Sequence, residues 1–302
     1  MKGYELLDAV GGIDAEFVKA ADRPVKRKQL PRVVGWIATA ACLCLVIGII
    51  VPHITGKGGL DTPISEGEDS VVKDMVSLEF NGAYYEATDI PEVLERFGLP
   101  TVLTEKLAGD RLSWLTSDNR VHYQESVAET EIELLEYAPS PCRGVYIIRD
   151  GSKYYAALFC GINALDSNAS TELETLYQIY GIQAVEDLVS IAEVDWNRNK
   201  VIGDAVTDQD ELAEFFQASK ALTSHGNDSF QGITFDGIPE EQQAEKHIAF
   251  ANDLRELRLE TKDGLRFYIG VFPTFGWISG DGVLSYYQIN EQMEAWLERN
   301  LR

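Results

Sequence analysis

The sequence predicts an α+β extracytoplasmic part, with antiparallel sheets that carry helices on one face, joined to one transmembrane helix. Three observations predict this fold class. Residues 33–51 contain no charged side chain and follow a basic segment. Beyond residue 75 the chain alternates hairpin signals with single helical segments. Asp-Gly dipeptides at positions 150 and 263 each separate two alternating apolar segments, which is a strong signal for a β-hairpin.

The charge-free segment Val33–Val51 is long enough to cross a bilayer, for which about 20 mostly apolar residues suffice. Because basic residues flank the cytoplasmic end of a membrane helix, we expect residues 1–32 in the cytoplasm, residues 33–54 in the membrane and the rest outside. A leader of 32 residues is too long for a cleavable signal peptide of the usual pattern. The basic residues before the segment are Arg23, Lys26, Arg27, Lys28 and Arg32.

The acidity of the chain lies on the predicted outer side. The whole chain has 26 Lys and Arg against 49 Asp and Glu. Residues 1–32 hold seven basic and five acidic residues, which leaves 19 basic and 44 acidic residues, a net charge of −25, for residues 33–302. Nucleic-acid affinity depends on Lys and Arg that neutralise phosphates, so this balance excludes a nucleic-acid partner for the outer part.

The predicted cytoplasmic tail has an apolar surface that it cannot bury. Residues 4–21 read as two short amphipathic helices interrupted by Gly11-Gly12, with Asp14 as an N-cap. Helices this short are marginal in water, so we expect a partner protein, the membrane surface or a second copy to cover them. The apolar set comprises Leu6, Leu7, Val10, Ile13, Phe17 and Val18.

These residues carry a resemblance. MKGYELLDAVGGIDAEFVKAA, the basic linker and AACLCLVIGI resemble the N-terminus of single-pass membrane proteins of clostridial-type bacteria, some of which are similar to anti-sigma factors encoded beside extracytoplasmic-function sigma factors. The resemblance covers about residues 1–55 and implies a sigma factor as the partner of residues 1–21. The chain departs from the zinc-binding anti-sigma family, because residues 1–32 contain no His-x-x-x-Cys-x-x-Cys motif.

After a Gly-rich and acidic stalk at residues 55–75, we expect two related α+β modules, residues 76–180 and 181–302. Asp89 and Asp208 each stand three residues before a Glu and ahead of an apolar helix, the pattern of a capping box. These two signals lie 119 residues apart and the two Asp-Gly turns 113 apart, which suggests a duplication. Different strand orders around the two helices would contradict it.

The last segment of the chain is predicted as a hairpin and a helix. The hairpin covers residues 277–289, and the helix begins after Asn290, a good N-cap residue. Met293, Trp296 and Leu297 lie on one face of this helix and are expected in the core.

Two of the four cysteines lie in the predicted membrane segment, where they act as small apolar residues. The other two, Cys142 and Cys160, flank the hairpin at position 150. Either a cross-strand disulfide or two free cysteines fits this placement. Two cysteines without nearby histidines are too few for a zinc site, so no metal is expected there.

The sequence contains no catalytic motif of a known reaction class. Among the histidines, His122 and His247 read as structural or exposed, and His225 in a predicted loop is the best single candidate for a ligand or catalytic role. Asn227, Asp228 and Asp236 lack the spacing of a calcium loop. In the pairs Tyr84-Tyr85, Tyr154-Tyr155 and Tyr286-Tyr287, alternation places one ring of each pair in the core.

We therefore expect a membrane-anchored, non-enzymatic regulator or sensor of the anti-sigma type, integral to the membrane, whose outer modules bind a ligand or an envelope component. The alternative is an envelope-tethered binding module with no cytoplasmic partner, and a third hypothesis is a wall hydrolase that uses His225. No cofactor is expected. Replacing Leu6, Leu7, Val10, Phe17 and Val18 while keeping the basic residues separates the first two hypotheses, because only a partner-binding tail requires these side chains.

Overall fold

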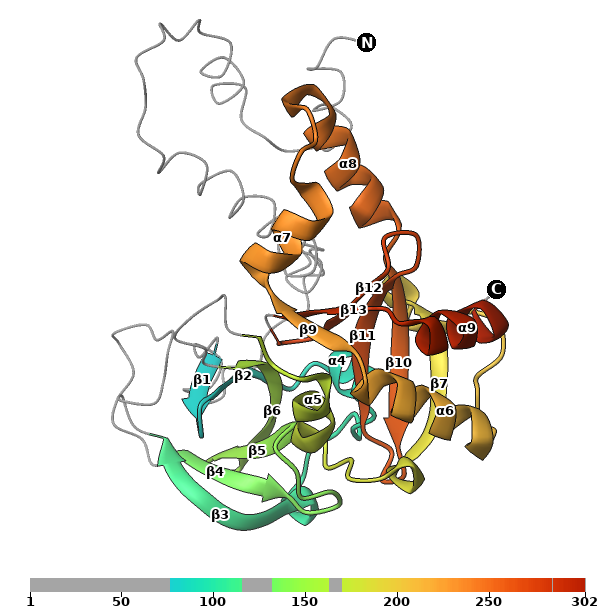
Figure 1. The fold of residues 1–302 in the computed structure, drawn as a ribbon. Coiled ribbons are helices and arrows are strands. Elements are labelled where there is room, and N and C mark those ends of the chain that lie inside the picture. Colours follow the sequence, from blue (N-terminus) through green and yellow to red (C-terminus); the bar gives the residue numbers. More distant parts are fainter. Residues whose placement is uncertain (1–76, 116–131, 163–169, 284, 302) are drawn as a thin grey trace, which may run out of the picture. The chain divides into compact units, whose positions relative to one another are not determined.

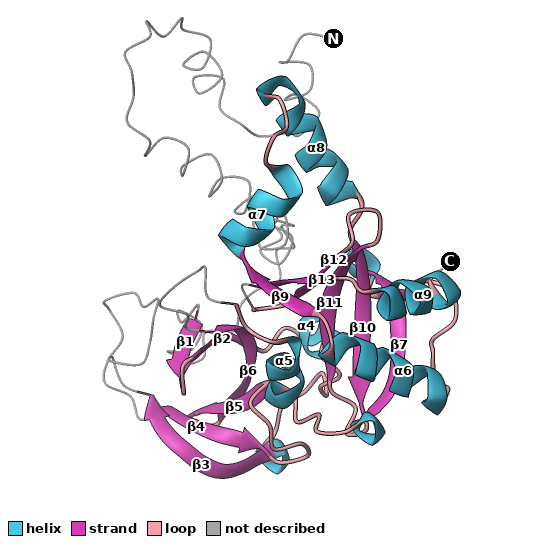
Figure 2. Cartoon of the chain, viewed as in Figure 1, coloured by secondary structure: helices cyan, strands magenta, loops and turns pink. Residues whose placement is uncertain are grey.

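The structure, a computed structural model, describes residues 77–115, 132–162, 170–283 and 285–301. These residues form two antiparallel sheets and six α-helices that connect or cover them (Figures 1 and 2). The predicted tail, membrane helix and stalk lie outside the described residues.

The first sheet has six strands in the order β1-β2-β6-β5-β4-β3. Asp150 pairs with Lys153, so Gly151 and Ser152 alone make the turn of the β5–β6 hairpin, which confirms the Asp-Gly signal. Gly151 has a φ of 58°, a conformation that glycine adopts without steric cost. The elements are β1 (Ser77–Phe80), β2 (Ala83–Thr88), α4 (Pro91–Arg96), η2 (Glu105–Leu107), β3 (Ala108–Leu115), β4 (Ile132–Tyr137), β5 (Val145–Asp150) and β6 (Lys153–Ile162).

The second sheet has seven strands in the order β8-β7-β10-β11-β12-β13-β9. The predicted hairpins at positions 263 and 277–289 are present as β10–β11 and β12–β13. The elements are α5 (Leu173–Ile179), η4 (Val185–Asp187), β7 (Leu188–Asp195), η5 (Trp196–Arg198), β8 (Lys200–Val201), α6 (Gln209–Lys220), β9 (Thr223–Gly226), α7 (Asn227–Phe235), α8 (Glu240–Asn252), β10 (Arg255–Thr261), β11 (Arg266–Phe272), β12 (Trp277–Gly280), β13 (Ser285–Gln288) and α9 (Glu291–Asn300).

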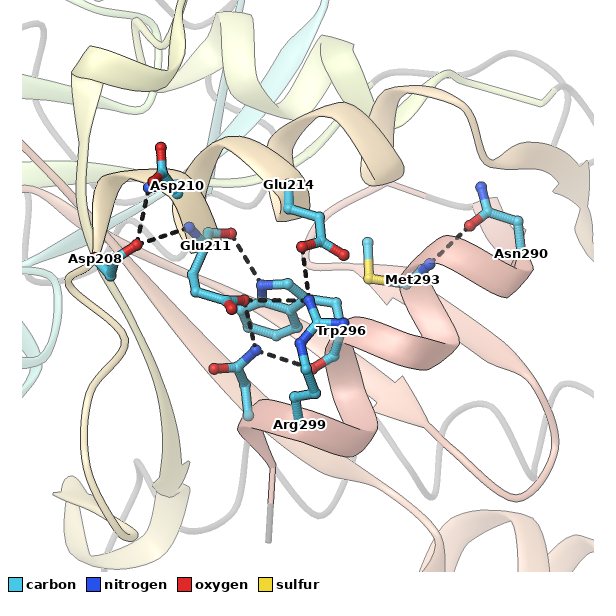
Figure 3. A network of polar contacts seen from close by, with 9 residues as sticks. Asp208, Asp210, Glu211, Glu214, Asn290, Met293, Trp296 and Arg299 are labelled. Carbon is cyan, nitrogen blue, oxygen red and sulfur yellow. Dashed lines mark hydrogen bonds and ion pairs between the residues drawn. The ribbon is translucent and has the colours of Figure 1, made fainter.

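Of the four predicted helix caps, Asp14 lies outside the described residues, and two of the other three are confirmed (Figure 3). The Asp208 carboxylate accepts hydrogen bonds from the amides of Asp210 and Glu211, at 3.0 and 3.1 Å, and so starts α6. The Asn290 side chain accepts from the amide of Met293 at 2.8 Å and starts α9. The Asp89 cap is wrong: α4 begins at Pro91 with Ile90 as its N-cap, because a proline is favoured at the first helical position.

One hydrophobic core joins the two sheets. All the described residues belong to one compact unit. The Tyr180 ring stacks on Phe267 of the second sheet, with ring centroids 4.6 Å apart, and meets Phe159 of the first sheet edge-on at 6.4 Å. The side chains of α5, α6 and α9 complete this core, and Trp296 of α9 is fully buried in it. Burial of these large apolar surfaces is the main term that stabilises the fold.

Helices cover both faces of the second sheet, and the prediction of helices on one face is wrong here. Val271 and Ile278 point into the core shared with α5, α6 and α9. Their neighbours Phe272 and Trp277 point the opposite way and form a separate cluster with Phe230 of α7. Because successive residues of a strand face opposite sides, the two sets of helices must lie on opposite faces. The alternating Tyr pairs behave as predicted, with Tyr85, Tyr155 and Tyr287 buried.

The predicted fold class needs two further corrections. Within the part of the chain that the structure describes, no helix is long and apolar enough to span a membrane, and the segment 33–54 lies outside that part. The description as an α+β part plus a transmembrane helix is therefore wrong for the described chain, which is a two-sheet α+β fold. The predicted duplication is also wrong as aligned. In the first sheet the second strand of the Asp-Gly hairpin, β6, pairs with β2, whereas in the second sheet the first strand of the hairpin, β10, pairs with β7.

Candidate functional site

Helices α7 and α8 form a helical hairpin inserted between β9 and β10 (Figure 2). Gly226 is the N-cap of α7 and Pro239 the N-cap of α8, and Gly237 between the two helices has a φ of 77°. The hairpin adds no residue to the core shared by the two sheets. The aromatic residues of the hairpin pack on β11, β12 and β13 of the second sheet, outside that shared core.

The hairpin is attached through an aromatic cluster. Phe230 of α7 stacks on Tyr286 of β13 with ring centroids 3.6 Å apart and meets Trp277 of β12 edge-on at 5.2 Å. Phe250 of α8 stacks on Phe272 of β11 at 4.0 Å. Such pairs contribute about 0.5–1.5 kcal/mol each beyond their buried area. The cluster thereby holds the base of the hairpin against the sheet.

A groove with a volume of about 320 Å³ lies between the base of this hairpin and the strands. The turn between β11 and β12 forms one wall, and the Asp253 carboxylate fixes this turn by accepting from the amide and the hydroxyl of Thr274, at 2.8 and 2.6 Å, and from the amide of Phe275 at 3.2 Å. We call this the hairpin groove. Its lining residues are Ile233, Thr234, Lys246, Thr274, Phe275, Gly276, Trp277, Gln288 and Ile289.

Two polar side chains of the hairpin groove differ in accessibility. The Thr234 hydroxyl is buried and has no hydrogen-bond partner among the described residues. The Lys246 ammonium lies 4.7 Å from the centroid of the Phe275 ring. The hydroxyl is closed off from the groove, so the Lys246 ammonium is the charged group that a ligand in the groove can reach.

His225 lies beside the groove and not in a loop as predicted. It belongs to the edge strand β9, opposite Tyr286 of β13. Its ring meets Trp277 edge-on at 5.3 Å, and Nδ1 lies 3.0 Å from the Ser229 hydroxyl oxygen. Nε2 is buried and has no partner among the described residues. A Ser–His pair needs a third group that orients the imidazole, so this contact alone does not make a nucleophile.

The residues weighed as a calcium site do not converge. Asn227 and Asp228 are in the first turn of α7, whereas Asp236 follows its last residue. At 1.5 Å per residue a helix of this length separates its two ends by about 12 Å, beyond the reach of a single ion. Across the ranges that the structure describes, no group of three or more potential metal ligands comes together.

A second polar cluster joins α4 to the second sheet. The Arg96 guanidinium lies over the Trp196 ring, 4.2 Å from its centroid, and donates to the Trp196 carbonyl at 3.2 Å. Glu256 of β10 lies nearby, and one of its carboxylate oxygens is buried without a partner among the described residues. Burial, with Asp281 and Asp195 adding to it and Arg96 opposing it, raises the pKa of Glu256 to about 7.

We expect Glu256→Gln to remove a pH dependence of stability. The pKa in the folded state exceeds the ordinary value of 4.5, so the stabilisation is fully present below pH 4.5 and is lost as the pH rises through the folded pKa. At pH 8 the variant should unfold with a free energy about 1–2 kcal/mol higher than the wild type, a value reduced because the side chain is only half-buried. Urea unfolding at pH 5 and pH 8 measures this; equal differences at both pH values would contradict it.

The structure leaves Cys142 and Cys160 as free cysteines, the former half-buried and the latter exposed. Burial raises the pKa of the Cys142 thiol, which keeps it protonated. Of the tryptophans, Trp277 and Trp296 are core residues, and Trp114 is 41% exposed. His247 lies on α8 and stacks on Phe235, with ring centroids 4.1 Å apart. The tail residues Leu6, Leu7, Val10, Phe17 and Val18 lie outside the described residues, as does His122, so these roles stay predictions.

Comparison of the chain with protein-family models finds no match, and comparisons with curated proteins and with solved structures find none either.

Proposed function

We propose that this chain is a non-enzymatic regulator or sensor, and that residues 77–302 bind a small ligand in the hairpin groove. One observation supports this most: an inserted helical hairpin, which adds no residue to the shared core, borders a groove lined by a lysine that makes no ion pair among the described residues. A volume of about 320 Å³ lies within the range that small-molecule sites occupy. Inserted segments on a rigid scaffold commonly carry the binding function of a domain.

Thr234→Phe should abolish ligand binding by filling the hairpin groove. Thr234 lines the groove from α7 and is half-buried, so a phenyl ring there occupies the space of the ligand. We would measure the thermal stability of the full-length chain against a library of small molecules. A ligand at a concentration of about 100 times its Kd adds about 2.7 kcal/mol, which corresponds to about 5–11 °C for a domain of this size. The shift should be absent in the variant.

The matched control is Ile248→Phe, which adds a phenyl ring to α8 at a side chain that is 62% exposed and does not line the groove. This variant should retain every increase in thermal stability that a ligand causes in the wild type. If Thr234→Phe lowers the stability of the free protein, Gln288→Trp fills the groove from an exposed position on the opposite wall. Ligand shifts that survive both groove-filling substitutions would overturn the assignment of the site.

A further inference from the structure

We infer that the hairpin groove takes a small molecule that carries one anionic group, and that Lys246 binds this group. This inference rests on the proposed function and specifies the ligand of the same site.

The charge of the groove is opposite to that of the chain. Asp and Glu outnumber Lys and Arg by 49 to 26 in the whole sequence. None of the nine lining residues is acidic, and one, Lys246, is basic. A ligand cation would therefore meet no carboxylate in this groove, whereas an anion would meet a single ammonium group. The local charge selects an anionic ligand over a cationic one.

Lys246 is free to bind an anion. Among the described residues it makes no ion pair within 4.0 Å, although acidic residues flank it on α8. The Asp253 carboxylate, which holds the β11–β12 turn but does not line the groove, already accepts three hydrogen bonds from that turn. The Lys246 side chain is half-buried, and the Phe275 ring holds its ammonium group at the groove.

The rest of the lining offers both polar and apolar contacts. Most of its accessible surface is polar, and Phe275, Trp277, Ile233 and Ile289 supply the aromatic and aliphatic part. Ile233 is 55% exposed although it is large and apolar. A small anionic molecule can therefore place an apolar portion against these side chains and its polar groups against the remaining surface. Lys246 is then the charged group that fixes the orientation of the ligand.

The test uses two fluorescent probes that differ mainly in charge. 1-Anilinonaphthalene-8-sulfonate carries one sulfonate on an aromatic body, and N-phenyl-1-naphthylamine has the same aromatic body without it. On the full-length chain we expect one sulfonate probe per chain, bound about tenfold more tightly than the neutral probe. Lys246→Gln should weaken the binding of the sulfonate probe by about tenfold, as expected for the loss of one charge-assisted hydrogen bond. It should leave the neutral probe unchanged, and Lys246→Arg should retain sulfonate binding.

Lys220→Gln is the matched control. Lys220 also lies over a phenylalanine ring, at 5.1 Å from Phe216, but it is paired with Glu174 at 2.6 Å and is not part of the groove. This substitution should leave the binding affinity of both probes unchanged. If Lys246→Gln leaves the sulfonate probe unchanged while Thr234→Phe removes both probes, the anion inference fails and the ligand site stands. If Thr234→Phe removes neither probe, the site itself is wrong.

Discussion

Gly98→Ala is expected to lower the free energy of unfolding by about 2–5 kcal/mol. Gly98 follows α4 with a φ of 77°, where a side chain costs about 1–2 kcal/mol. A Cβ built on it would meet the backbone carbonyl of Gly264, in the β10–β11 turn, far inside van der Waals contact. Backbone on both sides leaves no flexible group to move, so the overlap adds a strain of about 1–3 kcal/mol or more.

Gly82→Ala separates these two costs. Gly82 has a similar φ of 71°, but a Cβ there would meet no atom within 4 Å. The Gly82→Ala variant should therefore lose only the conformational part of the free energy of unfolding, about 1–2 kcal/mol. Urea unfolding of both variants gives the comparison, and equal losses would mean that the close approach of Gly98 to Gly264 is not tight.

Trp296→Ala is also expected to lower the free energy of unfolding strongly, by about 3–5 kcal/mol. The indole is fully buried between α9 and α6, with its ring 4.7 Å from that of Phe215. Its Nε1 donates to the Glu211 carbonyl at 2.9 Å (Figure 3). Truncation removes this hydrogen bond. It also leaves a cavity, because no neighbouring side chain can fill the space of an indole without strain.

Trp296→Phe is the informative companion. It retains most of the apolar volume and loses the indole N–H, so we expect a cost of about 1–2 kcal/mol. The surface ion pair of Arg299 with Glu214, at 2.6 Å on the same pair of helices, provides a contrast. Arg299→Gln should change stability by less than about 1 kcal/mol. A larger effect of Arg299→Gln than of Trp296→Ala would contradict the packing argument.

The sequence predicts those features that depend on a few neighbouring residues. The β5–β6 hairpin follows from its Asp-Gly turn, and the starts of α6 and α9 follow from Asp208 and Asn290. Each of these signals is complete within about four residues. The Asp89 cap is the local failure, because the proline at position 91 moves the helix start by one residue.

The arrangement of helices on the sheets could not be predicted in the same way. The strand Arg266–Phe272 reads as a nearly continuous apolar segment, since one face packs on the shared core and the other on α7 and α8. A strand that is apolar on both faces indicates burial but not which helix covers which face. The duplication failed for a related reason, because short signals of turn and cap recur in unrelated topologies.

The hairpin groove was missed because its lining comes from four separate elements between residues 233 and 289. Only the sheet register brings Gln288 beside Trp277. One signal was present: aromatic residues at 230, 235 and 250, on helices that otherwise contribute few core residues. Such residues indicate a local attachment to a sheet, and they mark where to look for a groove.

Helix α4 is completed by residues far away in the chain. The last carbonyl groups of a helix have no partner within it. Here Arg266 donates to the carbonyls of Glu95, at 3.1 Å, and of Phe97, at 3.1 Å, and the Tyr268 hydroxyl donates to that of Arg96 at 2.8 Å. The second sheet thus acts as the C-terminal cap of a helix that belongs to the first. Unfolding of either sheet removes the hydrogen-bond partners that the other supplies or accepts at the end of α4. Both halves should therefore lose their structure in a single cooperative transition.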